Sequence, residues 1–146
     1  MANSIFDSAR MFQLGSPSTI AWQTQTFQVA LMSTNYTPVT STGQVFWSDI
    51  SASETTGTAY TTKGNTVAMT VSNNSTLHHG VASPTTTSSN WAASTITSAG
   101  AVLFVSSTTV SNSPLIGWID FGATKTSSGG NFTIVWDATN GVAYLS

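Results

Sequence analysis

The chain of 146 residues contains no cysteine, and charged side chains are almost as scarce. Without cysteine there is no disulfide and no thiolate metal site. Only 5% of the residues are charged, whereas an average soluble domain carries about 25%. Three Lys and Arg residues cannot neutralise the phosphates that duplex binding requires, or hold a protein on an anionic membrane. We therefore exclude nucleic acid and membrane surfaces as partners.

Long apolar runs and targeting segments are also missing. No run approaches the roughly 20 apolar residues that a membrane-spanning helix needs. The first ten residues have neither the basic start nor the apolar stretch of a secretory signal. We expect a protein that is made in a cytoplasm and stays in solution.

Serine and threonine make up about a third of the chain, and hydrophobic residues a further 40%. Threonine is β-branched and favours strands, whereas the helix formers Lys and Glu are nearly absent. A chain of this length is expected to form one domain with one core. Its formal net charge of −2 gives little electrostatic protection against self-association. The composition therefore predicts a β domain that packs against copies of itself or against a large partner.

Eight short strand-like runs follow one another after residue 23, separated by polar turn signals. No helix-length segment lies between them, which argues against a parallel α/β sheet. The pattern predicts an all-β fold, an antiparallel β-sandwich or barrel with one short N-terminal α-helix. The runs are Thr24–Leu31, Gln44–Ile50, Asn65–Val71, Trp91–Thr97, Ala101–Val105, Leu115–Phe121, Asn131–Trp136 and Gly141–Leu145.

Three features within this pattern carry further predictions. Leu115–Phe121 is apolar on both faces, so it is expected to be a central strand or to lie at an interface. The stretch from Ser72 to Asn90 is predicted to be the longest loop, and its uncharged Ser/Thr-rich surface suits contact with a partner. Gly129 and Gly130 are predicted to form a hairpin turn.

A helix is expected over the first 14 residues. Asn3 or Ser4 can cap it, with Asp7 following in a capping-box-like arrangement. The apolar residues that share one helical face include Ala9 and Phe12. A Gly-Ser-Pro turn ends the segment.

Two interpretations of this helix remain open. It either lies across the core of its own domain or forms an arm that docks on a neighbouring subunit. The second divides the chain into an N-terminal helical arm, 1–17, and a β-sandwich domain, 18–146. It makes Phe6, Phe12 and Trp22 the predicted partner-binding residues. It also implies that a chain without its first 16 residues still folds.

No motif in the sequence indicates catalysis. The five acids are scattered, and Asp120 and Asp137 are best explained as caps at strand ends. His78 and His79 are adjacent, so in an extended chain they point to opposite faces and cannot readily hold one metal. No nucleophile elbow or phosphate-binding loop is present. We predict no catalytic, metal or cofactor-binding residues, and no cofactor.

Two C-terminal segments, at 113–122 (SPLIGWIDFG) and 131–141 (NFTIVWDATNG), resemble the ending of a family of small tailed-phage virion proteins. The Met-Ala-Asn start, the strand Phe27–Leu31 and the segment Phe46–Ile50 are similar to the same proteins. These motifs are structural and carry no chemistry. Some members of the family look like capsid decoration, or cement, proteins.

The resemblance implies a non-enzymatic virion structural protein that binds the outside of the phage head and stabilises it. Its partner would be the major capsid protein, with self-association, a trimer for example, in addition. The protein would be made in the host cytoplasm, and its final location would be the exterior of the phage head. One alternative is a receptor- or glycan-binding tail or head-fibre module, which exposed aromatics over a polar groove would support. Another is a glycan hydrolase, which needs two close carboxylates in a cleft.

Overall fold

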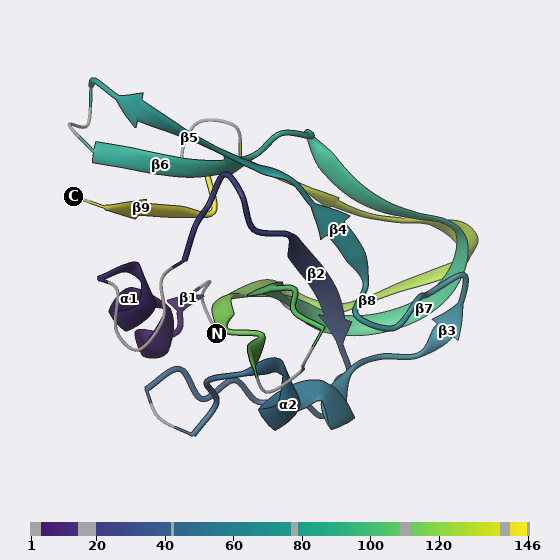
Figure 1. The fold of residues 1–146 in the computed structure, drawn as a ribbon. Coiled ribbons are helices and arrows are strands. Elements are labelled where there is room, and N and C mark those ends of the chain that lie inside the picture. The colour runs from purple at the N-terminus through teal and green to yellow at the C-terminus, as the bar shows by residue number, and fades with distance from the viewer. Residues whose placement is uncertain are drawn as a thin grey trace.

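Two antiparallel β-sheets make up most of the protein, and two short helices flank them (Figure 1). This computed structural model describes residues 4–14, 20–41, 43–76, 79–108, 112–137 and 141–145. The predicted all-β antiparallel fold is confirmed as a sandwich, and the sheets do not close into a barrel.

The elements follow one another in a simple order. They are β1 (Ser4–Ile5), α1 (Asp7–Gln13), β2 (Phe27–Met32), α2 (Trp47–Ile50), the 3-10 turn η1 (Ser51–Ser53), β3 (Gly57–Thr58), β4 (Asn65–Val67), β5 (Met69–Asn74), β6 (His79–Pro84), β7 (Ser88–Val105), β8 (Leu115–Val135) and β9 (Ala143–Leu145). The larger sheet has the order β1-β8-β7-β2-β4, with β3 also paired to β7. The smaller sheet has the order β5-β6-β9.

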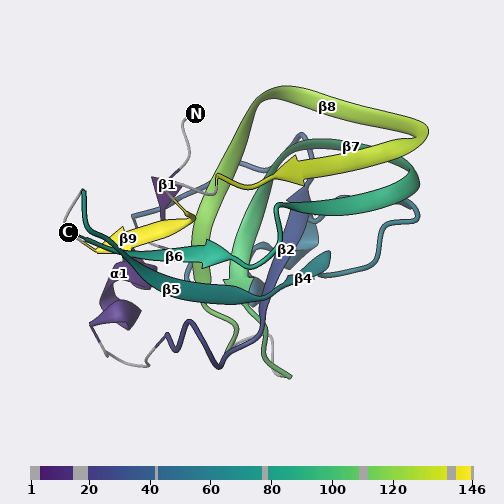
Figure 2. The same ribbon diagram turned by 90° about the horizontal axis from the view of Figure 1, so that it is seen from above.

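Strands β7 and β8 are much longer than the sequence predicted, at 18 and 21 residues. Each joins two runs that were expected to be separate strands, and Figure 2 shows the pair curving side by side along its length. The predicted turn at Gly129 and Gly130 is wrong: Gly129 has a φ of 69° but lies inside β8. The backbone ladder between β7 and β8 continues through this polar region, where Thr95 lies opposite Ser128. The Ser94 and Ser127 hydroxyls add a side-chain hydrogen bond at 2.8 Å.

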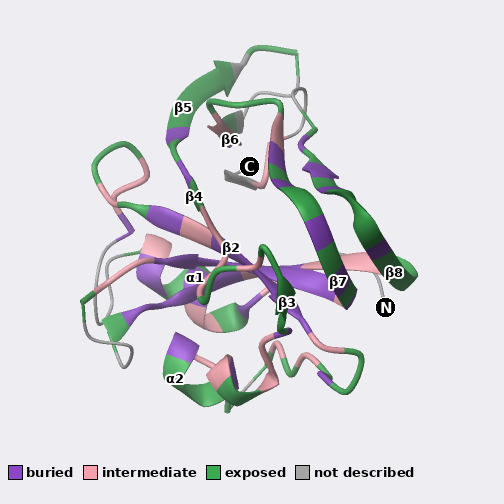
Figure 3. Ribbon diagram, turned by 90° about the vertical axis from the view of Figure 1, so that its right-hand side faces the viewer, coloured by how far each residue is buried: buried purple, intermediate pink, exposed green. Residues whose placement is uncertain are grey.

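The bend in β7 and β8 creates the second layer of the core. Register shifts in the β7–β8 ladder mark bulges between Trp91 and Ser94 and between Ser98 and Gly100, and bulges increase strand bending and twist. The first half of β7 and the second half of β8, which pair with each other, therefore curve back over the sheet. Buried and exposed residues alternate along them (Figure 3). Trp91 and Phe132 belong to the same buried cluster as the strands of the sheet centre.

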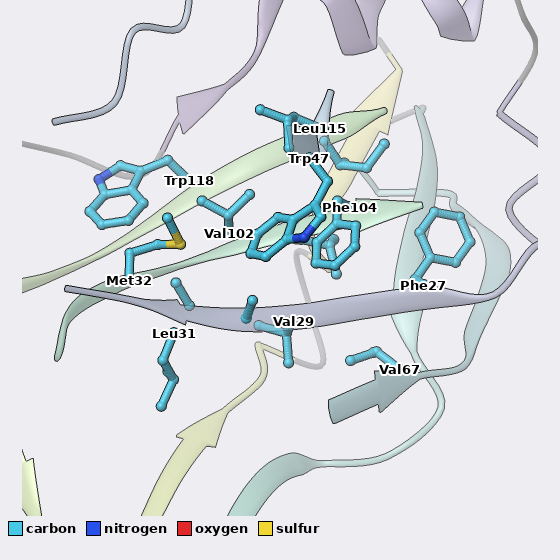
Figure 4. Close-up of a cluster of buried hydrophobic side chains, with 14 of the residues drawn as sticks. Phe27, Val29, Leu31, Met32, Trp47, Val67, Val102, Phe104, Leu115 and Trp118 are labelled. Atoms are coloured by element: carbon cyan, nitrogen blue, oxygen red, sulfur yellow. The ribbon is translucent and has the colours of Figure 1, made fainter. Parts of the chain in front are cut away.

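Leu115–Phe121 is confirmed as part of a central strand, because β8 lies between β1 and β7. Its Trp118 is 4% exposed and packs edge-on against Tyr36 at 5.3 Å. On the same face, Trp47 of α2 stacks on Phe104 with ring centroids 4.4 Å apart (Figure 4). A Cβ on Gly100 would lie 2.2 Å from the Trp118 ring, so this position accepts only glycine without rearrangement.

Two further segments differ from their predictions. Gln44–Ile50 was expected to be a strand but ends in helix α2, because the Asp49 carboxylate accepts hydrogen bonds from the backbone N–H groups of Val45 and Phe46 and closes a turn. The predicted loop from Ser72 to Asn90 contains most of the β5–β6 hairpin and the start of β7. Threonine favours strands whereas serine favours turns, so a segment rich in both was not assigned correctly from its composition.

Candidate functional site

The N-terminal segment is integrated into the fold. Ser4 and Ile5 form strand β1, which pairs with β8 at Trp118 and Gly117. Helix α1 begins only at Asp7, and its N-cap is Phe6 with no side-chain cap. The predicted cap at Ser4 is therefore wrong, and Asn3 lies outside the described residues.

Two of the three aromatic residues predicted to bind a partner are buried in the chain's own core. Phe6 and Phe12 are 0% and 2% exposed in the core of their own chain, and the Phe12 ring packs on Phe46 at 6.0 Å. Trp22 is half-buried and stacks on Phe27 at 5.1 Å. This corrects the sequence-based selection, because as packed here Phe6 and Phe12 have no surface to present to a neighbour. Of the two interpretations of the helix, the structure shows the one in which it lies across its own core.

The outer face of α1 carries two exposed apolar side chains. Met11 is 54% exposed, and Leu14, which directly follows the helix as its C-cap, is 82% exposed. They are three residues apart and so lie on the same side of the turn. We call them the α1 outer pair. The sequence contained a signal for this pair. Met11 and Leu14 are apolar, although residues that face away from Ala9 and Phe12 should be polar on a simple surface helix.

Charge around the α1 outer pair is small and balanced. Arg10 and Asp7 lie on the same helix, with the guanidinium nitrogen 3.7 Å from the carboxylate oxygen and both side chains exposed. Such an exposed pair contributes little to stability, on the order of 0–1 kcal/mol. The outer surface of α1 thus combines protruding apolar side chains with an ion pair of no net charge.

Two acids, Asp49 and Asp120, accept hydrogen bonds from nearby backbone groups. Asp49 closes the turn before α2, and the Asp120 carboxylate accepts a hydrogen bond from the Gly122 backbone at 2.8 Å. Within the described residues, no three His, Asp or Glu side chains gather into a group that could hold a metal ion. Of the adjacent histidines, His78 lies outside the described residues, and only the backbone of His79 is described.

Glu54 is a partly buried acid that accepts two hydrogen bonds. Its Oε1 accepts hydrogen bonds from the Tyr60 hydroxyl at 2.7 Å and from the Lys63 backbone N–H. The Tyr60 hydroxyl in turn accepts a hydrogen bond from the Leu31 backbone at 3.0 Å, which ties this loop to β2. Partial burial raises the pKa of Glu54, although both donated hydrogen bonds and the Lys63 charge oppose the rise. Burial also raises the pKa of Tyr60, and the bond to Glu54 adds to this effect.

The raised pKa of Glu54 predicts a pH effect on stability. In the interval just above the ordinary pKa of a glutamate, the folded state binds more protons than the unfolded state, so the free energy of unfolding falls as the pH rises through it. Glu54→Gln keeps a carbonyl oxygen for both donors but cannot ionise. We expect urea midpoints measured from pH 4 to 7 to fall less with pH in Glu54→Gln than in the wild type. Equal slopes in both proteins would contradict this account.

Comparisons with known proteins leave the family open. The sequence matches no protein-family model and no characterised protein, and the structure matches no solved structure. The resemblance to tailed-phage virion proteins therefore rests on the motifs alone and stays a prediction. None of the helices in the described ranges is long and apolar enough to cross a membrane.

Proposed function

We propose that the protein is a non-enzymatic virion structural protein that decorates the outside of a tailed-phage head and stabilises it. The observation that carries the proposal is the α1 outer pair: Met11 and Leu14 protrude from a short helix whose opposite face is locked into the core. A rigid support of this kind presents apolar side chains without the cost of ordering its backbone on binding. The partner is the major capsid protein.

The energetics suit a decoration protein. Burying each of these side chains at an interface contributes about 1.5–3 kcal/mol, which is modest for a single copy. A symmetric shell offers many equivalent sites, and binding to the assembled shell alone stabilises it by mass action. The balanced charge around α1 keeps such binding insensitive to salt.

The motif resemblance supports the choice of a phage head as the surface. The described parts of segments 113–122 and 131–141, which are similar to the virion family, lie mostly in β8 and contribute core residues such as Leu115 and Phe132. They would therefore specify the fold shared with that family. The interaction with the capsid would come from exposed residues elsewhere.

The receptor- or glycan-binding alternative is less well supported. Such a module typically stacks sugars on exposed aromatic rings. Among the side chains that the structure describes, the large hydrophobics that are exposed are all aliphatic or Met: Met11, Leu14, Val39, Val71 and Val135. No described aromatic ring is among them.

The proposal predicts saturable binding to phage heads that lack the protein. We expect the purified protein to raise the temperature at which such heads release their DNA or lose their shells. Replacing the outer pair by Met11→Asp and Leu14→Asp should weaken binding on the order of a hundredfold or more, because both apolar contacts are lost and two charges would be buried. Binding is measured by co-sedimentation with heads over a range of protein concentrations.

Val135→Asp provides the matched control. Val135 is 77% exposed, comparable to Leu14, but belongs to β8. It should leave head binding unchanged, while circular dichroism confirms that all variants are folded. Binding to tails or cells without heads would refute the decoration function. Unchanged binding of the double variant would refute the role of the α1 outer pair.

A further inference from the structure

Strand β5 has a free edge that differs from the other sheet edges. It ends the smaller sheet and pairs only with β6 among the described strands. The edge strands β1, β3, β4 and β9 have two or three residues each, whereas β5 has six. The long strands β7 and β8 also have free stretches, but bulges interrupt their ladder. The β5–β6 ladder runs from Met69 to Asn74 without a register shift.

The hydrogen-bond pattern identifies the groups on this edge. The Thr85 N–H donates to the Ala68 carbonyl at 2.9 Å, so this pair is a hydrogen-bonded one. Bonded and non-bonded pairs alternate along an antiparallel ladder. Met69, Val71 and Asn73 therefore face β6 at non-bonded positions and direct their N–H and C=O groups to the free edge.

The edge carries none of the usual devices against pairing with another chain. Natural edges are blunted by Lys, by Pro, by bulges or by short length. Residues 64–119 contain no Asp, Glu, Lys or Arg, and β5 itself contains no Pro. Val71 is 43% exposed, and β5 is drawn largely as exposed in Figure 3. An open, uncharged edge of this kind is a template for strand addition.

We propose that β5 pairs with β5 of a second copy, antiparallel, about a two-fold axis through Val71. Outward-facing residues must form the bonded pairs, so Val71 lies opposite the partner's Val71, and Met69 lies opposite the partner's Asn73. Three such pairs provide six hydrogen bonds between the copies. The two smaller sheets then become one continuous six-stranded sheet.

A second copy suits this edge because the arrangement is self-complementary. The two exposed Val71 side chains cover each other, and Thr70 lies across from the partner's Ser72 on the other face. No like charges meet, since the whole hairpin edge is uncharged. A single pair of strands buries less than the roughly 1,200–2,000 Å² of a stable complex, so the dimer is in concentration-dependent equilibrium with the monomer. This pairing does not depend on what the outer surface of α1 binds.

A single cysteine tests the register directly, because the chain has none of its own. Bonded partners lie about 5.5 Å apart between Cα atoms, which a disulfide can span. We expect Val71→Cys to form a covalent dimer under mild oxidation, seen on a non-reducing gel. Val135→Cys, also an exposed valine, should stay largely monomeric. Equal cross-linking of the two variants would overturn the proposed register.

Analytical ultracentrifugation of the unmodified protein tests the dimer itself. The wild type should show a monomer–dimer equilibrium that shifts toward dimer with concentration. Val71→Lys places two like charges opposite each other and should abolish the dimer, whereas Val135→Lys should not. Because the Val71 N–H points outward, Val71→Pro should also give a folded monomer. A wild type that is monomeric at every concentration, or dimers that persist in Val71→Lys and Val71→Pro, would overturn the proposal.

Discussion

Deleting residues 1–16 is expected to unfold the protein. The deletion removes Phe6 and Phe12, which are 0% and 2% exposed, and the strand β1 that pairs with β8. Truncating one buried Phe to Ala costs about 3–5 kcal/mol. Loss of both rings with their strand therefore consumes most of the roughly 5–15 kcal/mol by which a domain of this kind is stable. Circular dichroism and thermal melting of the truncated chain check this expectation.

Point variants separate the inner and outer faces of the same helix. Phe12→Ala should lower the free energy of unfolding by about 3–5 kcal/mol. Met11→Ala, one residue away but 54% exposed, should change it by less than about 0.5 kcal/mol. A truncated chain that melts cooperatively near the wild-type temperature would show that the helix is a detachable arm after all.

Replacing Trp47 by Ala is expected to have the second-largest effect. Trp47 is 1% exposed, and its indole stacks on Phe104 at 4.4 Å with an interplanar angle of 10°. It joins α2 to the centre of the large sheet, and its backbone N–H donates to the Ser113 carbonyl at 2.8 Å. We expect a loss of about 3–5 kcal/mol, or roughly 10–20 °C in Tm, measured by calorimetry or urea unfolding.

Trp22→Ala is the matched control for this prediction. It makes the same chemical change at an indole that stacks on Phe27 but remains half-buried. Its loss should therefore be clearly smaller than that of Trp47→Ala. A larger loss for Trp22→Ala would mean that the core is centred on the Trp22–Phe27 contact rather than on α2.

Much of the fold follows from local patterns, and the exceptions have physical causes. The apolar alternation of Thr24–Leu31 predicts a strand, and β2 overlaps it at Phe27–Met32. By contrast, the middle of β8 is polar and exposed, so no hydrophobic period marks it as a strand. It is held by its ladder with β7, a contact between residues far apart in sequence. Pairing of this kind cannot be seen in a short window.

The candidate site was only partly within reach of the sequence. The N-terminal helix and its apolar face with Ala9 and Phe12 were identified, but the sequence left open whether that face packs on the chain's own core or on a neighbouring subunit. Phe12 and Met11 are both hydrophobic neighbours, yet one is buried and the other protrudes. The answer depends on β1, which directly precedes the helix and pairs with β8. That pairing is set by tertiary structure.

By itself, the sequence determined the class of this protein: no cysteine, few charges and a third Ser and Thr leave a β domain with an uncharged surface. Tertiary structure alone decided that Phe6 and Phe12 belong to the core, that β7 and β8 bend into two layers, and that β5 keeps an open edge. The reason is physical. Composition and periodicity record local preferences, whereas burial and strand pairing depend on which distant residues meet.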